Sequence, residues 1–301
     1  MYDSILFMKN YLSLIKFSHT VFALPFALVG FFLALYTEHK NLDLKILFCV
    51  LLCMVFARSA AMAFNRYLDR DIDAKNPRTT VREIPAGIIS AHSALIFVVM
   101  SSLLFIITTW FINPLCFYLS PIALVVILGY SYTKRFTYLC HFVLGLGLAL
   151  APLGAYLAVT GKFALLPLIY SSIVLLWVSG FDIIYALQDE AFDKSLQLNS
   201  IPVKLGKAGA LRLSNILHAL CALMMLWAVW QLNGTLKGQN TEGVAFGWLN
   251  ALGAMLFMGL LFYQHSLVKP DDLSKVNLAF FTTNGIASVI YGSFFILDYW
   301  I

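Results

Sequence analysis

The segment Asn65–Gly87, NRYLDRDIDAKNPRTTVREIPAG, decides how the rest of the chain is interpreted. Nine of its 23 residues are charged, against 12% of the whole chain, so much of the charge lies in one connecting segment. Within it, Asn65, Asp69 and Asp73 recur every four residues. A helical continuation of the preceding apolar run would place these three side chains on one face. We therefore expect the chemistry of the protein here.

The types of side chain in this segment indicate what it binds. Three oxygen-bearing side chains followed by Lys75, Arg78 and Arg82 suit a hard cation together with a polyanion, namely Mg²⁺ with a phosphate or diphosphate. The alternative is a solvated, positive loop at a membrane surface. That alternative explains the basic residues but not the four-residue spacing of the oxygen ligands.

Composition places the protein in a membrane. The chain has 301 residues, is 61% hydrophobic and contains 25 Phe, 14 Tyr and 6 Trp, with a mean hydropathy of +0.84. Apolar segments recur at about the 20 residues that span a bilayer. The net charge of +5 favours an anionic membrane leaflet as partner over nucleic acid. The five cysteines lie in or beside apolar stretches without metal spacing, so we expect no disulfide.

Hydropathy predicts an all-α, polytopic protein in which residues 1–301 form a single domain. The amphipathic N-terminal segment has no small-residue cleavage site after an apolar core, so we expect no removed signal peptide. The predicted spans number nine. They cover residues 20–37, 46–65, 91–111, 115–132, 139–160, 165–187, 209–232, 246–265 and 277–298.

The connections between these spans alternate in charge. Lys and Arg gather in the N-terminal segment and in the loops after the second, fourth, sixth and eighth spans, whereas the other loops are poorer in charge. The positive-inside rule then places the N-terminus and both acidic segments in the cytoplasm and Ile301 outside. The expected location is a membrane of the bacterial inner (plasma) membrane type.

A second acidic unit, FDIIYALQDEAFDKSLQLNSIPVKLG, begins at Phe181. Asp182, Asp189 and Asp193 fall within about 40° of one another on a helical face. Asp182 lies inside an apolar span, where an ionisable group costs roughly 2.5 kcal/mol or more unless it is paired or faces a cavity. It is therefore a candidate functional residue, and the alternative is a structural ion pair with a neighbouring helix.

The two acidic units follow spans that end on the same expected side, four spans apart, which suggests an internal duplication. Paired carboxylate clusters are suited to two Mg²⁺ ions around one diphosphate. The fourth span ends in GYSYTKRF on the same side, so Lys134 and Arg135 are candidate phosphate contacts. Tyr130 and Tyr132 either line an aromatic wall or belong to an interfacial aromatic belt.

A diphosphate site that opens into a bilayer suits a lipid substrate with an isoprenoid tail. The tail would lie along the apolar helices while the head reaches the carboxylates. Metal coordination would let diphosphate leave, and a nearby nucleophile would trap the allylic carbocation. Water must then be excluded from the site.

These motifs resemble those of the UbiA superfamily of intramembrane aromatic prenyltransferases. NRYLDRDID with Arg78, Thr79, Arg82, Pro85 and Gly87 is similar to its first signature, YALQDEAFD to its second and YSYTKRFTY to the Lys-Arg motif between them; SIPVKLG is similar as well. The resemblance implies nine transmembrane helices around a central cavity, capped by two Asp-rich cytoplasmic loops. It also implies an Mg²⁺-dependent prenyltransferase whose partners are a polyprenyl diphosphate, an aromatic acid and membrane lipid, with no obligate protein partner.

The resemblance assigns roles to individual residues. Asp182 would lie deeper than the metal site, near the acceptor, and with Asp69 and Asp189 makes up the expected catalytic set. The metal ligands would be Asn65, Asp69, Asp73, Asp189 and Asp193. The substrate-binding residues, from both the resemblance and the motifs, would be Arg78, Arg82, Lys134, Arg135, Tyr185 and Lys204.

Two departures from the common family pattern concern the acceptor. Arg66 stands where an acidic residue is usual, and NPRTTVREIP is longer and differently charged than the usual segment. Lys75 to Pro85 is most similar to 4-hydroxybenzoate polyprenyltransferases of ubiquinone or menaquinone synthesis, so we expect transfer of a polyprenyl group to a ring carbon of such a phenolic acid. A dihydroxynaphthoate is the alternative acceptor.

Two other functions fit the sequence less well. Haem farnesylation is disfavoured by the Lys75–Pro85 segment. In a secondary transporter the charged residues of the binding site are expected near the middle of the membrane. Here all the aspartates of the two motifs except Asp182 are expected at one face of the membrane. The histidines have no metal-ligand spacing and no evident carboxylate pairing, so we expect structural hydrogen bonds from them.

Overall fold

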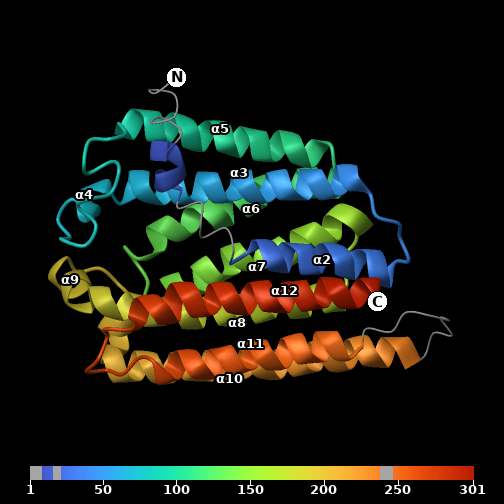
Figure 1. The fold of residues 1–301 in the computed structure, drawn as a ribbon. Helices are drawn as coiled ribbons and strands as arrows, with labels where there is room; N and C mark the ends of the chain where they lie inside the picture. The colour runs from blue at the N-terminus through green and yellow to red at the C-terminus, as the bar shows by residue number, and fades with distance from the viewer. Residues whose placement is uncertain (1–8, 16–21, 238–246) are drawn as a thin grey trace.

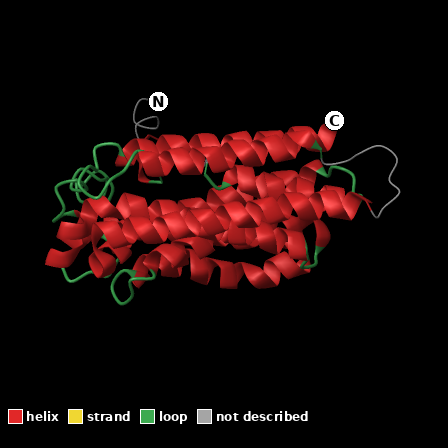
Figure 2. Cartoon of the chain, turned by 90° about the horizontal axis from the view of Figure 1, so that it is seen from below, coloured by secondary structure: helices red, strands yellow, loops and turns green. Residues whose placement is uncertain are grey.

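The computed structural model describes residues 9–15, 22–237 and 247–301 (Figures 1 and 2). Regular structure in these residues is helical, apart from one isolated bridge between Lys269 and Asp272. The expectation of an all-α protein is confirmed. Long apolar helices lie side by side, as expected for an integral membrane protein, in which backbone groups must be satisfied within each segment.

The long helices match the predicted spans in position. They are α2 (Leu24–Thr37), α3 (Leu44–Leu68), α5 (Ala91–Trp110), α6 (Pro114–Thr133), α7 (Cys140–Thr160), α8 (Leu165–Ala186), α10 (Ile201–Lys237), α11 (Trp248–Ser266) and α12 (Asn284–Trp300). Shorter elements are α4 (Arg70–Asp73), the 3-10 turn η2 (Leu187–Asp189), α9 (Glu190–Ser195) and the π-helical turn η3 (Leu278–Thr283), which leads into α12.

Seven helices in the described part of the chain are long and apolar enough to cross a membrane. The two remaining predicted spans correspond to α2, which has 14 residues, and α11. The start of the first predicted span, residues 20–21, falls outside the described residues, as does Phe246 at the start of the eighth. The count of nine spans therefore stays a prediction.

Local sequence fixes where several helices start and end. Asp43 caps α3 by accepting hydrogen bonds from the amides of Lys45 and Ile46 at 2.9 and 3.2 Å. Asn113 caps α6 in the same way and is followed by Pro114, whose missing N–H is not needed at that position. At the C-terminal end of α7, Gly161 adopts φ +67°, the left-handed geometry in which glycine ends helices.

The helices surround two regions of different character. One is an aromatic core around Trp177, where α2, α8, α11 and α12 meet through rings such as Phe26, Phe257 and Tyr291. Close approach of α2 to α7 requires Gly30, since a Cβ there would lie 2.1 Å from the carbonyl oxygen of Pro152. The second region, between α3, α6, α7 and α8, holds the cavities described below.

The two acidic motifs lie at the same end of the helices. In Figure 1, α4 and α9 are at the left end and the C-terminus is at the right. At Gly206 the backbone leaves helical geometry (φ +68°, ψ 171°), which separates SIPVKLG from the membrane-length part of α10. SIPVKLG is thereby kept at the end that carries α9.

Candidate active site

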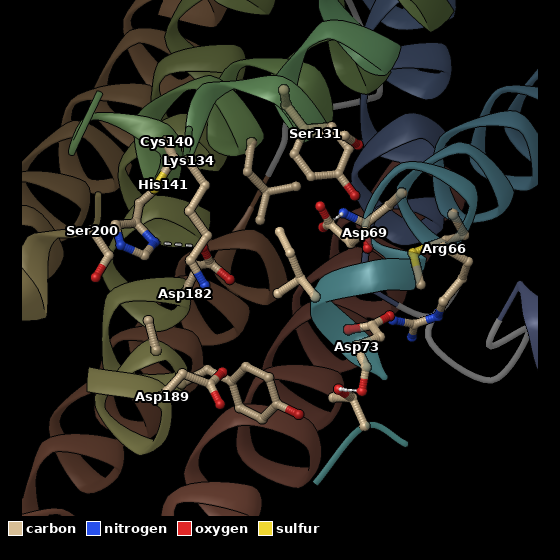
Figure 3. Close-up of a pocket in the computed structure, with 18 of the residues that line it drawn as sticks. Arg66, Asp69, Asp73, Ser131, Lys134, Cys140, His141, Asp182, Asp189 and Ser200 are labelled. Atoms are coloured by element: carbon tan, nitrogen blue, oxygen red, sulfur yellow. Dashed lines mark hydrogen bonds and ion pairs between the residues drawn. The ribbon is translucent and has the colours of Figure 1, made fainter. Parts of the chain in front are cut away.

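A polar cavity of about 730 Å³ opens at the end of the molecule that carries α4 and α9. It is lined by residues of both acidic motifs, by the end of α6 and by the start of α7. The structure brings together all the predicted site residues except one; those on the cavity wall are Asn65, Asp69, Asp73, Arg78, Arg82, Lys134, Arg135, Asp182, Tyr185, Asp189 and Asp193. Figure 3 shows Asp69 and Asp73 on one side and Asp182 on the other.

Lys204 is the exception. It lies in the first turn of α10, is exposed, and does not belong to the cavity wall. Its ammonium lies 5.7 Å from the centre of the Tyr138 ring, within range of a cation–π interaction. The predicted phosphate contact from Lys204 therefore has no support from this arrangement.

The first motif is helical across its predicted four-residue spacing. The amide of Asp69 donates to the carbonyl of Asn65 at 2.9 Å, and the amide of Asp73 donates to the carbonyl of Asp69 at 2.7 Å. A break at Asp69 separates α3 from α4 without interrupting this pattern. Asn65 Nδ2 also donates to Asp69 Oδ2 at 3.0 Å.

The second motif is reached through a change of helix type. The helix α8 ends at Ala186, η2 carries Asp189, and α9 carries Asp193. The shared face expected from regular helical spacing is therefore altered after Asp182, because a 3-10 turn has about three residues per turn. Asp182 stays in α8, below the mouth, while Asp189 and Asp193 lie at the mouth itself.

Each of the four mouth carboxylates is paired with a basic residue. Arg135 Nη2 lies 2.9 Å from Asp69 Oδ1, and Arg82 Nη1 lies 2.6 Å from Asp73 Oδ1. These two pairs tie the first motif to the Lys-Arg motif and to its own loop.

The other two pairs cross the mouth of the cavity. Arg78 binds both carboxylate oxygens of Asp189 in a bidentate pair, and its Nη1 donates to the Tyr185 hydroxyl at 2.9 Å. Lys134 Nζ lies 2.7 Å from the buried carboxylate of Asp193. The residues expected to hold metal are thus neutralised by the residues expected to hold phosphate.

Electrostatics at the mouth follow from this pairing. Burial raises the pKa of Asp69 above its ordinary value, and the charge and hydrogen bond of Arg135 oppose that shift. For Arg78, burial lowers the pKa, but the charge of Asp189 and the hydrogen bonds outweigh it, and the net shift is upward. Arg78 therefore stays a fixed cation at the entrance.

The donor set at the mouth suits a hard cation. Carboxylate and amide oxygens are the ligands that Mg²⁺ takes, and Oδ2 of Asp73 is buried without a hydrogen-bond partner in the described chain. Among the described residues, however, no three His, Cys, Asp or Glu side chains stand close enough to hold one metal ion. Mg²⁺ usually takes one or two protein carboxylates together with substrate oxygens and water, so a cluster of three is not needed to bind it.

Among the cavity residues that the sequence did not identify as site residues, His141 contacts a carboxylate and Arg58 carries a charge within the long helices. His141, at the start of α7, places Nδ1 2.6 Å from Asp182 Oδ2, which corrects the expectation that the histidines lack a carboxylate partner (Figure 3). Arg58 lies in the apolar part of α3, lines the cavity, and has a buried Nε without a hydrogen-bond partner in the described chain. A charge inside an apolar span was the available signal for Arg58, as it was for Asp182.

A second, apolar cavity of about 370 Å³ adjoins the polar one. Both cavities are lined by Arg58, Met62, Tyr130, Leu144 and Leu148. From these shared residues the second cavity runs along α7 to Ala158 and to Phe163 beyond its end. A polar mouth therefore continues into an apolar space between α3, α5, α6 and α7.

Comparison with known proteins identifies the family. The model of the UbiA prenyltransferase family matches residues 23–286. A 4-hydroxybenzoate octaprenyltransferase of Aliivibrio fischeri (strain MJ11) is 30% identical over 257 residues, covering 83% of this chain and 82% of the relative. The corresponding protein of Vibrio cholerae (strain ATCC 39541) is 30% identical over 251 residues, covering 82% and 83%.

Solved structures agree with this result. The apo structure of a UbiA homologue from Aeropyrum pernix K1 is 30% identical, has a TM-score of 0.80, and covers 93% of this chain and 98% of its own. A UbiA homologue from Archaeoglobus fulgidus bound to GPP and Mg²⁺ shares the fold at 21% identity, with a TM-score of 0.71 and coverage of 97% and 100%. The chain therefore belongs to the UbiA prenyltransferase family and is a prenyltransferase.

Proposed function

We propose that this protein transfers a polyprenyl group from its diphosphate to a ring carbon of a phenolic acid of the 4-hydroxybenzoate type, in quinone synthesis and with Mg²⁺. The observation that carries this proposal is the junction of the two cavities. A charged mouth and an apolar tail space meet there, with Arg58 on the wall of both cavities and Asp182 on the wall of the charged one. The relatives named 4-hydroxybenzoate octaprenyltransferase support the same acceptor class.

The mouth would bind the diphosphate. The carboxylates of Asp69, Asp73, Asp189 and Asp193, with the amide oxygen of Asn65, would hold Mg²⁺. Once bound, the cation would neutralise the diphosphate as a leaving group. Arg78, Arg82, Lys134 and Arg135 would then exchange their carboxylate partners for phosphate oxygens. The homologue structure with GPP and Mg²⁺ supports this assignment at the level of the fold.

The apolar cavity would hold the prenyl tail. Its walls are largely alanine, leucine, isoleucine, valine and glycine residues along α3, α5, α6 and α7. A tail laid there would place its first carbon near the shared residues, between the mouth and the aromatic acceptor. Exclusion of water from this space would protect the allylic cation from hydrolysis.

The acceptor would lie at the junction between the cavities. Arg58 has no ion-pair partner among the described residues and lies in an apolar wall, and an aromatic carboxylate is an anion of matching planar geometry. Asp182 would accept the hydrogen bond of the phenol hydroxyl and raise the electron density at the adjacent ring carbon. A dihydroxynaphthoate also carries a carboxylate beside a phenol, and it is the alternative acceptor.

The transfer needs no reactant besides the prenyl diphosphate and the phenolic acid. The bond between the first prenyl carbon and the diphosphate oxygen breaks, and diphosphate leaves with the electron pair. The ring carbon beside the hydroxyl then attacks the allylic cation and forms the new C–C bond. Loss of the proton from that ring carbon to the carboxylate of Asp182 restores aromaticity. The products are the prenylated acid, diphosphate and one proton.

The membrane arrangement belongs to the same proposal. We assign α2 and α11 to the membrane with the seven longer helices, which gives nine spans in one domain over residues 1–301. The Asp-rich mouth would face the cytoplasm of a bacterial inner membrane, where both the diphosphate and the aromatic acid are available. Lipid would surround the protein, and no protein partner is required by this arrangement.

The test is a product assay. Purified protein in lipid is incubated with Mg²⁺, a polyprenyl diphosphate, and either 4-hydroxybenzoate, a dihydroxynaphthoate or benzoate, and the products are identified by mass. The expected product is a C-prenylated phenolic acid, with benzoate unreactive because it lacks the activating hydroxyl. Prenylation of neither phenol, with the protein folded and the diphosphate bound, would overturn the proposed acceptor class.

A further inference from the structure

His141 and Asp182 form a pair on neighbouring helices. The imidazole Nδ1 lies 2.6 Å from Asp182 Oδ2, joining the start of α7 to the last third of α8 (Figure 3). His141 is 3% exposed, whereas the Asp182 side chain keeps 21% of its surface accessible and lines the cavity. Both residues line the cavity, and the histidine is the more buried member of the pair.

The second imidazole nitrogen fixes the tautomer. Nε2 lies 3.4 Å from the backbone amide of Ile201, at the start of α10, and an amide can only donate. This contact assigns Nε2 as the acceptor and the ring proton to Nδ1, which then donates to Asp182 Oδ2. Ser179 Oγ lies 3.3 Å from the carbonyl oxygen of His141, although the nearer acceptor of its single proton is the carbonyl of Leu175 at 2.7 Å.

This arrangement leaves the two carboxylate oxygens of Asp182 unequal. Oδ2 is engaged by His141, whereas no hydrogen bond to Oδ1 is formed within the described chain. A hydrogen bond received at Oδ2 restricts rotation of the carboxylate and stabilises its charged form. The oxygen that remains able to accept a proton is Oδ1.

We infer that His141 is the positioning residue that orients Asp182, so that Oδ1 receives the proton released by the prenylated ring carbon. The inference rests on the proposed function, in which Asp182 faces the aromatic acceptor. His141 keeps its own Nδ1 proton throughout. The ring proton passes to Oδ1 and then to solvent through the polar mouth as the products leave, so no further reactant is needed.

The experiment compares four variants with wild type in lipid. His141→Leu removes the donor, His141→Asn places an amide donor near the position of Nδ1, Asp182→Asn removes the base, and His141→Leu/Asp182→Asn combines the losses. For each, kcat, KM for both substrates, binding of a non-reactive diphosphate analogue, and the melting temperature are measured. Rates are also compared for acceptor with hydrogen or deuterium at the reacting ring carbon.

The expected result separates positioning from folding. His141→Leu should lower kcat about a hundredfold, the size of loss seen when a catalytic group is displaced by about 1 Å, with unchanged diphosphate binding. Its isotope effect should rise, because ring deprotonation becomes slower. His141→Asn should recover most of kcat, and adding His141→Leu to Asp182→Asn should cost little more than Asp182→Asn alone.

Other outcomes have distinct meanings. The positioning role would be overturned if His141→Leu lowered kcat by the same factor in wild type and in Asp182→Asn. It would also be overturned if His141→Leu lowered the melting temperature and left the isotope effect unchanged. Either result would leave the proposed function standing. If His141→Leu does not fold, His141→Asn is used instead. The positioning role is supported if the isotope effect of His141→Asn lies between the values for wild type and Asp182→Asn. It is contradicted if that isotope effect equals the wild-type value while kcat is lowered. Full activity of Asp182→Asn would instead remove the role assigned to that carboxylate in the proposed function.

Discussion

Lys134 Nζ lies 2.7 Å from Asp193 Oδ1, so the end of α6 is bound to α9 across the mouth of the cavity. The sequence motifs assign the lysine to phosphate and the aspartate to metal, yet here the two neutralise each other. Breaking such a pair by removing one partner leaves a buried charge uncompensated, which costs several kcal/mol. Cation and diphosphate together would supply a new partner for each residue, so we expect them to bind cooperatively.

Metal dependence is the first prediction. Asp69→Asn and Asp189→Asn should each abolish prenyl transfer with Mg²⁺ present, because each removes a ligand of one shared site, and the double variant should be little worse. The measurement is product formation by mass, with and without chelator. Asp71→Asn is the matched control, since Asp71 is an exposed carboxylate of α4, two residues after Asp69, and lies outside the cavity wall. Substantial activity of both single variants in chelator would contradict the metal site.

The bidentate pair of Arg78 leads to the second prediction. Arg78→Lys keeps the charge but loses the planar fork that contacts Asp189 and Tyr185. We expect KM for the polyprenyl diphosphate to rise about tenfold, equivalent to about 1.4 kcal/mol, a typical share for a charged hydrogen bond. KM for the acceptor should not change. Arg70→Lys, outside the cavity, serves as control, and an equal effect there would remove the special role of Arg78.

The apolar cavity predicts how tail length is tolerated. Gly154 of α7 lines that cavity, and a Cβ added there would meet no atom within 4 Å. Gly154→Leu should therefore fill tail space without disturbing the helix packing. Turnover of long polyprenyl diphosphates should fall strongly relative to geranyl diphosphate, measured by competition and mass. Gly259→Leu in α11, where a Cβ also meets nothing, is the control; parallel loss for both chain lengths in Gly154→Leu would contradict this use of the cavity.

Topology is the fourth prediction. Lys75→Cys and Asn41→Cys, each introduced into a variant whose five native cysteines are alanine, lie in connections at opposite ends of α3. A membrane-impermeant thiol reagent added to intact cells should label the cysteine at position 41, and the one at position 75 only after lysis. Labelling of Lys75→Cys in intact cells would reverse the orientation.

The fifth prediction concerns the effect on turnover of removing the charge of Asp182. Asp182→Asn keeps size and hydrogen bonding to His141 but removes the proton acceptor, so kcat should fall by about 10² to 10⁴, the usual contribution of a general base. Binding of diphosphate and the melting temperature should stay near those of wild type. A lowered melting temperature with normal turnover would make Asp182 a packing residue, the alternative that its position in an apolar span also allowed.

The sequence by itself determined the class of fold and most of the mouth. Hydropathy located every long helix of the described residues, because a membrane segment must satisfy its backbone internally and so shows its length in composition. The spacing of Asn65, Asp69 and Asp73 was read correctly as helical, because hydrogen bonds four residues apart are a local property. The same local reasoning assigned Lys204 to the phosphate, whereas the structure places it outside the cavity wall and beside the Tyr138 ring.

Only the tertiary structure decided which residues meet. The pairing of Lys134 with Asp193 and the contact of His141 with Asp182 each join two different helices, and Arg58 lines both cavities. Nothing in the local sequence encodes these contacts, because they depend on how α3, α6, α7 and α8 pack around the cavity. The physical reason is that a helix fixes the angular position of its own side chains, whereas the neighbour that each side chain faces is fixed by packing between helices.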